Sequence, residues 1–166
     1  EIIEQTKTSI EYFTKAYEES ATQMSKDANV QQIVAHPDYY PWMLEGLKAY
    51  MEGHENVKAI YVGTVDKKMH IYPEMDLTGF DPTTRPWYQK ALEEKKLIWT
   101  EPYVDKFSGE LVITVATPVY NSFDNNELVG VLGIDLSLDT ISSQISNIKI
   151  GKKGWCMEMN TSQTIY

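Results

Sequence analysis

The period of the apolar residues changes once along the chain, and this change constrains the fold more than any other feature. Before residue 37, apolar residues recur at spacings of three, four and seven, which places them on one face of a helix. The residues on this face are Ile3, Ile10, Phe13, Tyr17, Ala21, Met24 and Ala28. From residue 57 onward, β-branched residues alternate with polar ones, as in half-buried strands. A helical segment followed by strands predicts an α+β fold.

Three helices are expected from the positions of Gly and Pro. Residues 1–36 contain neither, so they predict one long N-terminal helix of about 25–33 residues. Its narrow apolar stripe fits packing on the domain, and it equally fits a partner helix, for example in a homodimer. Pro41 and Pro86 each open a further helix, and these are expected to end near Gly53 and Lys96.

Strands are expected at residues 57–65, 69–72, 97–104, 111–120 and 128–136. Short loops join consecutive strands, which implies antiparallel pairing. The expected architecture is a five-stranded antiparallel sheet with a helical crossover between the second and third strands. A last helix is expected over residues 139–148. The chain then divides into a helix over 1–36, an α+β module over 37–148 and an exit segment over 149–166.

Composition excludes several classes of function. Fifteen Lys and Arg against 24 Asp and Glu give a formal charge of −9, which disfavours nucleic acid and anionic membranes as partners. The single cysteine, Cys156, excludes an internal disulfide framework, and the three His show no metal-ligand spacing. The sequence also lacks a Gly-rich phosphate loop and a G-x-S-x-G motif. We therefore expect no metal, no cofactor and no catalytic residue.

The most informative segment is F-D-P-T-T-R-P-W-Y, residues 80–88, together with T-E-P-Y-V-D, residues 100–105. The planar guanidinium of Arg85 can bind a carboxylate through two parallel hydrogen bonds. Aromatic faces next to a carboxylate suit a cation. A zwitterion would satisfy both groups. Taken one at a time, these residues also have structural interpretations, in which Trp87 and Tyr88 belong to the core and Arg85 pairs with Asp81.

Four segments resemble the double Cache family: D-P-T-T-R-P-W-Y-Q-K-A, T-E-P-Y-V-D, G-E-L-V-I-T-V-A-T-P-V-Y and G-V-L-G-I-D-L-S-L. This family comprises PAS-like extracytoplasmic sensor domains of chemoreceptors and sensor histidine kinases. The resemblance implies a long N-terminal helix and two stacked PAS-like modules, of which residues 37–148 would form the membrane-distal, ligand-binding one. Residues 151–155 resemble the opening of a second module, so we expect the chain to be a piece of a longer protein.

The resemblance also implies a ligand site. In the members that bind amino acids, the matching positions are Arg85, Trp87, Tyr88, Tyr103 and Asp135, and Phe80 stands where the family has Tyr. The missing hydroxyl favours a methylated amine, so betaine-like ligands compete with ordinary amino acids. Asp105 is either a hairpin-turn residue or a residue at the rim of the pocket.

The sequence thus predicts an extracytoplasmic sensor domain that binds a small amine or zwitterion and catalyses no reaction. Its connection to a membrane would run only through flanking helices, because no apolar run here reaches the roughly 18 residues of a membrane span. The alternative is a PAS-like module without a small-molecule ligand, which dimerises or senses a partner protein. Binding of an amino acid or a betaine would separate the two.

Overall fold

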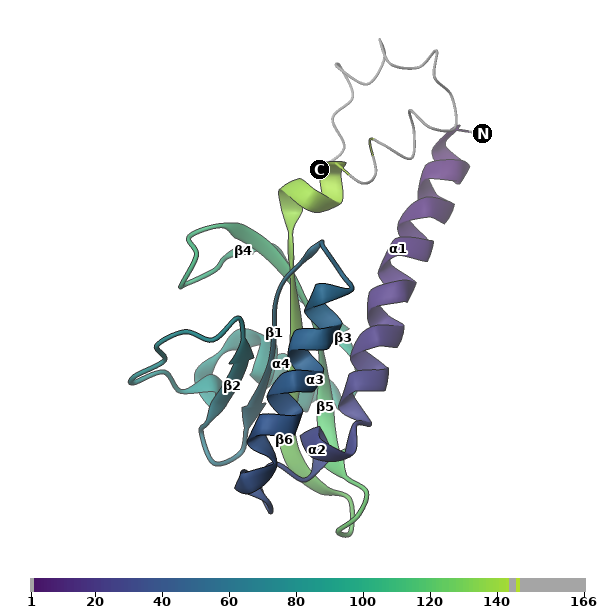
Figure 1. The fold of residues 1–166 in the computed structure, drawn as a ribbon. Helices are drawn as coiled ribbons and strands as arrows, with labels where there is room; N and C mark the ends of the chain where they lie inside the picture. The colour runs from purple at the N-terminus through teal and green to yellow at the C-terminus, as the bar shows by residue number, and fades with distance from the viewer. Residues whose placement is uncertain (1, 144–145, 147–166) are drawn as a thin grey trace.

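The structure, a computed structural model, describes residues 2–143 and 146. It contains one antiparallel sheet in the order β2-β1-β6-β5-β3, with β4 also paired to β5 (Figure 1). The strands are β1 (Val57–Thr64), β2 (Met69–Tyr72), β3 (Ile98–Trp99), β4 (Tyr103–Val104), β5 (Leu111–Asn121) and β6 (Glu127–Ser137). The α+β class, the antiparallel pairing and the helical crossover are confirmed.

The expected strand at 97–104 is divided in two. Trp99 pairs with Val115 and Tyr103 pairs with Val112, so three residues of one strand lie opposite two of β5. Such a bulge bends the strand, and Pro102 within it has no amide hydrogen for a ladder bond. The sheet therefore has six strands instead of the expected five, because β3 and β4 lie one after the other along the same side of β5.

The expected long N-terminal helix is confirmed, but it is 24 residues long and does not extend to residue 36. Helix α1 (Ile2–Ser25) ends before Asp27, whose extended backbone and side chain begin a new helix, α2 (Ala28–Gln31). The Asp27 carboxylate accepts hydrogen bonds from the amides of Asn29 and Val30. Because these bonds cap the first turn of α2, a new helix starts here, although the helical spacing of apolar residues continues to Ala28.

The other helices begin close to the expected positions. The 3-10 turn η1 (Pro37–Tyr39) leads into α3 (Tyr40–Glu52), and the 3-10 turn η2 (Pro82–Thr84) leads into α4 (Pro86–Glu94). A further helix begins at Leu138 directly after β6. The exit segment expected over 149–166 lies outside the described residues, and the division into three segments stays a prediction.

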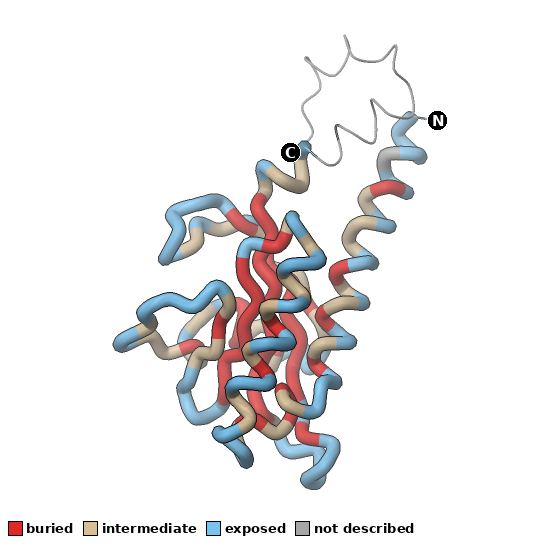
Figure 2. The backbone as a smooth tube through the Cα atoms, in the orientation of Figure 1, coloured by how far each residue is buried: buried red, intermediate tan, exposed pale blue. Residues whose placement is uncertain are grey.

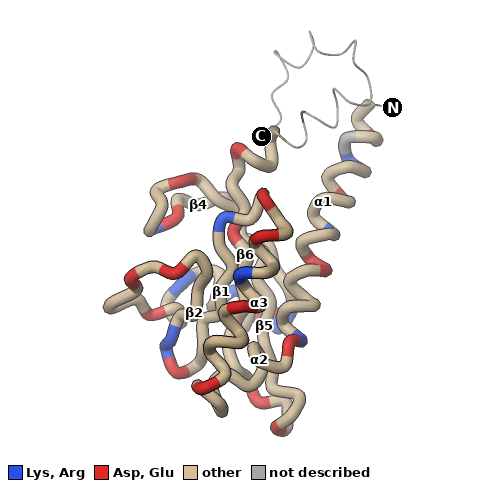
Figure 3. Tube along the Cα trace, in the orientation of Figure 1, with Lys and Arg blue, Asp and Glu red and all other residues tan. Residues whose placement is uncertain are grey.

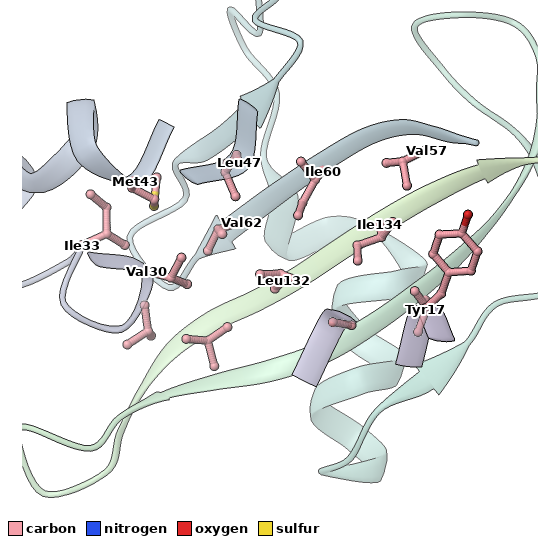
Figure 4. Packing of buried hydrophobic residues seen from close by; sticks show 14 of the residues in the cluster. Tyr17, Val30, Ile33, Met43, Leu47, Val57, Ile60, Val62, Leu132 and Ile134 are labelled. Atoms are coloured by element: carbon pink, nitrogen blue, oxygen red, sulfur yellow. The ribbon is translucent and has the colours of Figure 1, made fainter. Parts of the chain in front are cut away.

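The two faces of the sheet carry different helices. Helices α1 and α3 cover one face and α4 covers the other, and the central strands β1, β5 and β6 between them are mostly buried (Figures 1 and 2). The first face holds the larger core, in which Leu47, Ile60 and Leu132 are fully buried (Figure 4). On the second face, Tyr61 and Val131 pack with Trp87 and Ala91 of α4. Asp and Glu residues are scattered over loops and exposed helix faces (Figure 3).

Gly133 of β6 lies directly opposite Tyr61 of β1 in the ladder, and its lack of a side chain leaves room for the tyrosine ring. A Cβ at residue 133 would lie 2.6 Å from Cζ of Tyr61, a distance that requires the buried ring to move. Gly46 offers a matched comparison, because it lies inside α3 and a Cβ added there would meet no atom within 4 Å.

Gly133→Ala is expected to lower the free energy of unfolding by about 1–3 kcal/mol, since it overpacks a closed site. Gly46→Ala is expected to raise it by about 0.5–1 kcal/mol, because alanine favours the helix. Urea denaturation of both variants measures these changes. Equal stability of Gly133→Ala and wild type would contradict the close packing of Tyr61 on β6.

Candidate functional site

A cavity of about 370 Å³ lies on the second face of the sheet, between β1, the start of α4 and the bulged β3–β4 segment. Its volume falls in the usual range for small-molecule sites. Six of the seven residues predicted from the sequence line it: Phe80, Arg85, Trp87, Tyr103, Asp105 and Asp135. These residues come from segments far apart in the sequence, and the fold brings them to one cavity.

The loop before α4 sets the position of Arg85 and Trp87. The Asp81 side chain accepts a hydrogen bond from the amide of Thr83 at 2.9 Å, which begins η2, and Pro86 then starts α4. Gly63 of β1 allows this loop to approach, because a Cβ there would lie 2.7 Å from Pro82 and 2.9 Å from the Trp87 ring. In the middle of α4, Nζ of Lys90, which also lines the cavity, donates to the carbonyl of Trp99 at 2.9 Å and ties the helix to β3.

Asp135 forms the acidic end of the cavity. It lies in β6 opposite Thr114 of β5 and is only 6% exposed. The hydroxyls of Tyr61 and Thr114 each donate to its Oδ1 at 2.6 Å. The Tyr103 hydroxyl lies 2.7 Å from Oγ1 of Thr114. Four side chains from four strands thus form one hydrogen-bonded group, which we call the Asp135 network: Tyr61, Tyr103, Thr114 and Asp135.

Burial changes the acidity of this network. It raises the pKa of Asp135 to about 6, although the hydrogen bonds from Thr114 and Tyr61 act in the opposite direction. Burial and the nearby Asp135 carboxylate also raise the pKa of Tyr61 and Tyr103 above the usual value for a phenol. At neutral pH the network therefore holds two neutral phenols around a carboxylate that lacks a cation. A bound cation would relieve this imbalance.

Arg85 supplies the opposite charge. Within the described part of the chain, no carboxylate oxygen lies within 4.0 Å of its guanidinium, and Asp81 is 4.0 Å from Lys67 instead. The guanidinium carbon lies 5.5 Å from the centre of the Phe80 ring, and Phe80 contacts Phe107 at 5.2 Å between centroids. The expected alternative, an Arg85–Asp81 ion pair, is not formed. Arg85 is held by an aromatic face and remains available to an anion.

The remaining predicted residues have other surroundings. Tyr88 is not among the residues that line the cavity; it is buried among the residues that pack α4 on the sheet, with its ring edge-to-face to Trp87. Asp105 has both of its expected roles, since its Oδ2 accepts the amide of Ser108 in the hairpin turn at 2.8 Å while the residue lines the cavity. Phe80 contacts Arg85, and its expected preference for a methylated amine stays a prediction.

Sequence reasoning missed two members of the Asp135 network, Tyr61 and Thr114. Both lie inside strands where aromatic and β-branched residues are common, so their types carry no functional signal. The signal that was available for Tyr61 is Gly133, because a glycine inside a buried strand marks a close approach. Also unassigned from the sequence were the apolar lining residues Met69 and Ile71.

The family of the chain follows from its match to known sequences. Residues 14–143 match the family model described as methyl-accepting chemotaxis protein-like, first PDC sensor domain. The chain belongs to this family. Its relatives include the chemotaxis protein McpC of Bacillus subtilis, 30% identical over 92% of this chain, and TlpB of the same organism, 37% identical over 67% of it. The matched regions span 24% and 16% of those two proteins.

Solved ligand-binding domains of chemoreceptors share the fold. The domain of CtaA from Pseudomonas fluorescens, in complex with L-valine, has a TM-score of 0.70 and 27% identity over 89% of this chain and 63% of that one. The sensory domain of Campylobacter jejuni Tlp3, with isoleucine bound, has a TM-score of 0.75 and 22% identity over 87% of this chain and 60% of its own. This sensor domain is therefore a PAS-like domain of the chemoreceptor type.

Two further findings concern the sensor domain itself. None of the helices in the described residues combines the length and the apolar character needed to cross a bilayer. Among the same residues, no three His, Cys, Asp or Glu side chains gather as they would around a metal ion. The role of the family is sensing, which agrees with the expected sensor function.

The raised pKa of Asp135 predicts a pH-dependent stability. Its ordinary pKa is 3.8 and the folded value is about 6, so between them the folded protein binds the proton more tightly than the unfolded chain. The stability that comes from this tighter proton binding is fully present below pH 3.8, and it is lost as the pH rises through about 6. Relative to Asp135→Asn, the free energy of unfolding of wild type should fall by about 2 kcal/mol between about pH 4 and about pH 7.

Chemical denaturation of wild type and Asp135→Asn across this pH range measures the effect. Asp76→Asn is the control, because the hydrogen bond from Thr78 lowers the pKa of this exposed carboxyl. The stability of wild type relative to Asp76→Asn should therefore rise with pH, whereas its stability relative to Asp135→Asn should fall. A constant difference between wild type and Asp135→Asn would contradict the burial of a charged carboxylate at residue 135.

Proposed function

We propose that this sensor domain binds a small L-amino acid as its zwitterion. The observation that carries the proposal is that one cavity contains both a buried carboxylate, Asp135, and a guanidinium without a carboxylate partner, Arg85. Each group lacks a counter-ion within the described residues, and their charges are opposite. An α-amino acid carries the complementary pair on adjacent carbon atoms.

The ammonium would lie at the Asp135 network. The phenol oxygens of Tyr61 and Tyr103 and the Asp135 carboxylate are all hydrogen-bond acceptors, and a primary ammonium has three N–H donors to distribute among them. Removing this carboxylate from water is costly unless a cation pairs with it. The ligand would therefore gain a charge-assisted bond that the empty site lacks.

The carboxylate would lie at Arg85, next to Trp87 at the start of α4. A guanidinium binds a carboxylate through two parallel hydrogen bonds, and the Phe80 face beneath it restricts the orientation of the planar group. The apolar side chains of Met69 and Ile71 line the same cavity and would contact the ligand side chain. This lining favours a small apolar amino acid, such as the L-valine bound by CtaA.

A primary ammonium fits this arrangement better than a quaternary one. A trimethylammonium group has no N–H donor, so it would leave the acceptors of the Asp135 network without partners in a buried site. Phe80 contacts Arg85 and so belongs to the carboxylate end. Its missing hydroxyl then has no bearing on the ammonium, and ordinary amino acids take precedence over betaines.

The larger protein is proposed by analogy with the relatives. The chain would be the membrane-distal module of an extracytoplasmic chemoreceptor region, with residues 37–148 as the ligand-binding module and the segment from residue 149 opening a second one. Near its start, helix α1 exposes the apolar side chain of Ile3, which would suit a homodimer contact. Catalysis forms no part of this role, and the output would lie in cytoplasmic regions outside this chain.

Three related ligands test the orientation: L-valine, isobutylamine, which lacks the carboxylate, and isovalerate, which lacks the ammonium. Arg85→Ala should weaken L-valine and isovalerate about ten- to a hundredfold but leave isobutylamine unchanged, because only the first two carry an anion. Asp135→Asn should weaken L-valine and isobutylamine by a similar factor and spare isovalerate. Isothermal titration calorimetry gives all the dissociation constants.

Lys96→Ala and Asp76→Asn are the matched controls, because each removes an exposed charge outside the cavity. Neither should change any of the three affinities. If Arg85→Ala binds L-valine as wild type does, the proposed orientation is wrong. If wild type binds neither L-valine nor any other of the twenty amino acids, the module without a small-molecule ligand becomes the better description.

A second test concerns methylation of the amine. Wild type should bind glycine more tightly than N,N,N-trimethylglycine, since the methyl groups remove every N–H donor. Phe80→Tyr should leave the ratio of the two dissociation constants unchanged, because residue 80 contacts Arg85. Calorimetry on both proteins measures the ratio. If Phe80→Tyr increases the preference for glycine over N,N,N-trimethylglycine, residue 80 lies at the ammonium end instead.

A further inference from the structure

We infer that Thr114 is a positioning residue that fixes the direction of the hydrogen bonds in the Asp135 network and so turns Tyr103 into an acceptor for the ligand. Thr114 is fully buried and does not line the cavity, so it acts through Tyr103 and Asp135 rather than on the ligand. The inference rests on the proposed function, because the ligand group concerned is the ammonium.

The direction follows from counting protons. The Asp135 carboxylate has no proton to donate, so the 2.6 Å bond to its Oδ1 uses the single hydroxyl proton of Thr114. Oγ1 of Thr114 can then only accept from the Tyr103 hydroxyl at 2.7 Å. Tyr103 therefore donates toward β5. Its oxygen keeps lone pairs for a donor, and its proton is not available to the cavity.

Tyr61 is oriented in the same way from the other side. Its hydroxyl proton is directed to Oδ1 of Asp135 at 2.6 Å, so its oxygen also keeps only acceptor capacity. The network thus offers the cavity acceptors. A ligand with N–H donors fits, and a ligand that presents an oxygen acceptor at this end finds no proton.

The backbone around Thr114 holds it in this position. The amide of Thr114 donates to Oγ1 of Thr100 at 3.0 Å, and the amide of Thr100 donates to the carbonyl of Thr114 at 2.9 Å. These two bonds lie at the bulge between β3 and β4. The bulge therefore fixes Thr114 and brings Tyr103 to it from the adjacent strand segment.

Without the Thr114 hydroxyl, Tyr103 would lose its acceptor and Asp135 would lose one donor. The phenol proton would be free to turn toward the cavity or toward Asp135, where it would compete with the ammonium. The charged form of the Asp135 carboxyl would be less stabilised, so its pKa would rise. Both effects weaken ammonium binding, and neither follows from a purely structural role of Thr114.

Thr114→Val removes the hydroxyl and keeps the shape, while Thr114→Ser keeps the hydroxyl and removes a methyl group. Thr117→Val is the matched control, because Thr117 is also buried in β5 and its hydroxyl contacts the carbonyl of Pro118, outside the network. If Thr114→Val does not give folded protein, Thr114→Ala removes the same hydroxyl and takes its place in the measurements.

The first measurement is the titration of the Asp135 side-chain carboxyl by NMR without ligand. The midpoint should rise by about one pH unit in Thr114→Val and remain at the wild-type value in Thr114→Ser and Thr117→Val. The titratable groups around Asp135, which are Tyr61 on β1, Tyr103 on β4 and Asp105 beyond it, are present in every variant. An unchanged midpoint in Thr114→Val overturns the inference.

The second measurement is calorimetry at pH 7 with L-valine, isobutylamine and isovalerate. Thr114→Val should weaken L-valine and isobutylamine about tenfold and leave isovalerate unchanged, and Thr114→Ser should restore the wild-type constants. Equal binding of L-valine by wild type and Thr114→Val overturns the inference while the proposed function stands. If wild type binds none of the twenty amino acids, the proposed function fails, and the titration of Asp135 without ligand then decides by itself whether Thr114 sets the protonation state of Asp135.

Discussion

A carboxylate in the middle of a β-sheet must be surrounded by hydrogen-bond donors, and the burial of Asp135 sets this requirement for one whole face of the sheet. Tyr61 reaches it from β1 only because Gly133 leaves room for the ring. Thr114 reaches it from β5, directly opposite in the ladder. The opposite face carries ordinary apolar packing against α1 and α3, so it can stabilise the domain while the other face holds an unneutralised charge.

The sequence predicted what depends on local pattern. The change of period gave the fold class, the turn residues gave the antiparallel pairing, and Pro86 gave the start of α4 with Arg85 and Trp87 beside the cavity. It did not predict the places where a single side chain interrupts an element that the hydrophobic pattern continues. Asp27 ends α1 by capping α2 while the apolar stripe continues to Ala28, and Pro102 lies in the bulge that divides a strand that otherwise reads as continuous.

The same distinction separates the site residues that the sequence predicted from those that it missed. Arg85 was found through its chemistry beside aromatic residues and Asp135 through its resemblance to a family position, whereas Tyr61 and Thr114 are typical strand residues whose contacts with the site come only from cross-strand neighbours. Tyr88 shows the converse, since the same resemblance assigned it to the site and the structure places it in the packing of α4.

The bulge between β3 and β4 has a consequence for the solution behaviour of the domain. This segment and the four-residue β2 are the outermost members of the sheet, the places where a foreign strand could add by backbone hydrogen bonding. The offset of one residue, together with Pro102, leaves no straight row of donors and acceptors along that side. The irregularity that carries Tyr103 to the cavity thereby also guards the sheet against intermolecular strand addition, the first step of β-aggregation.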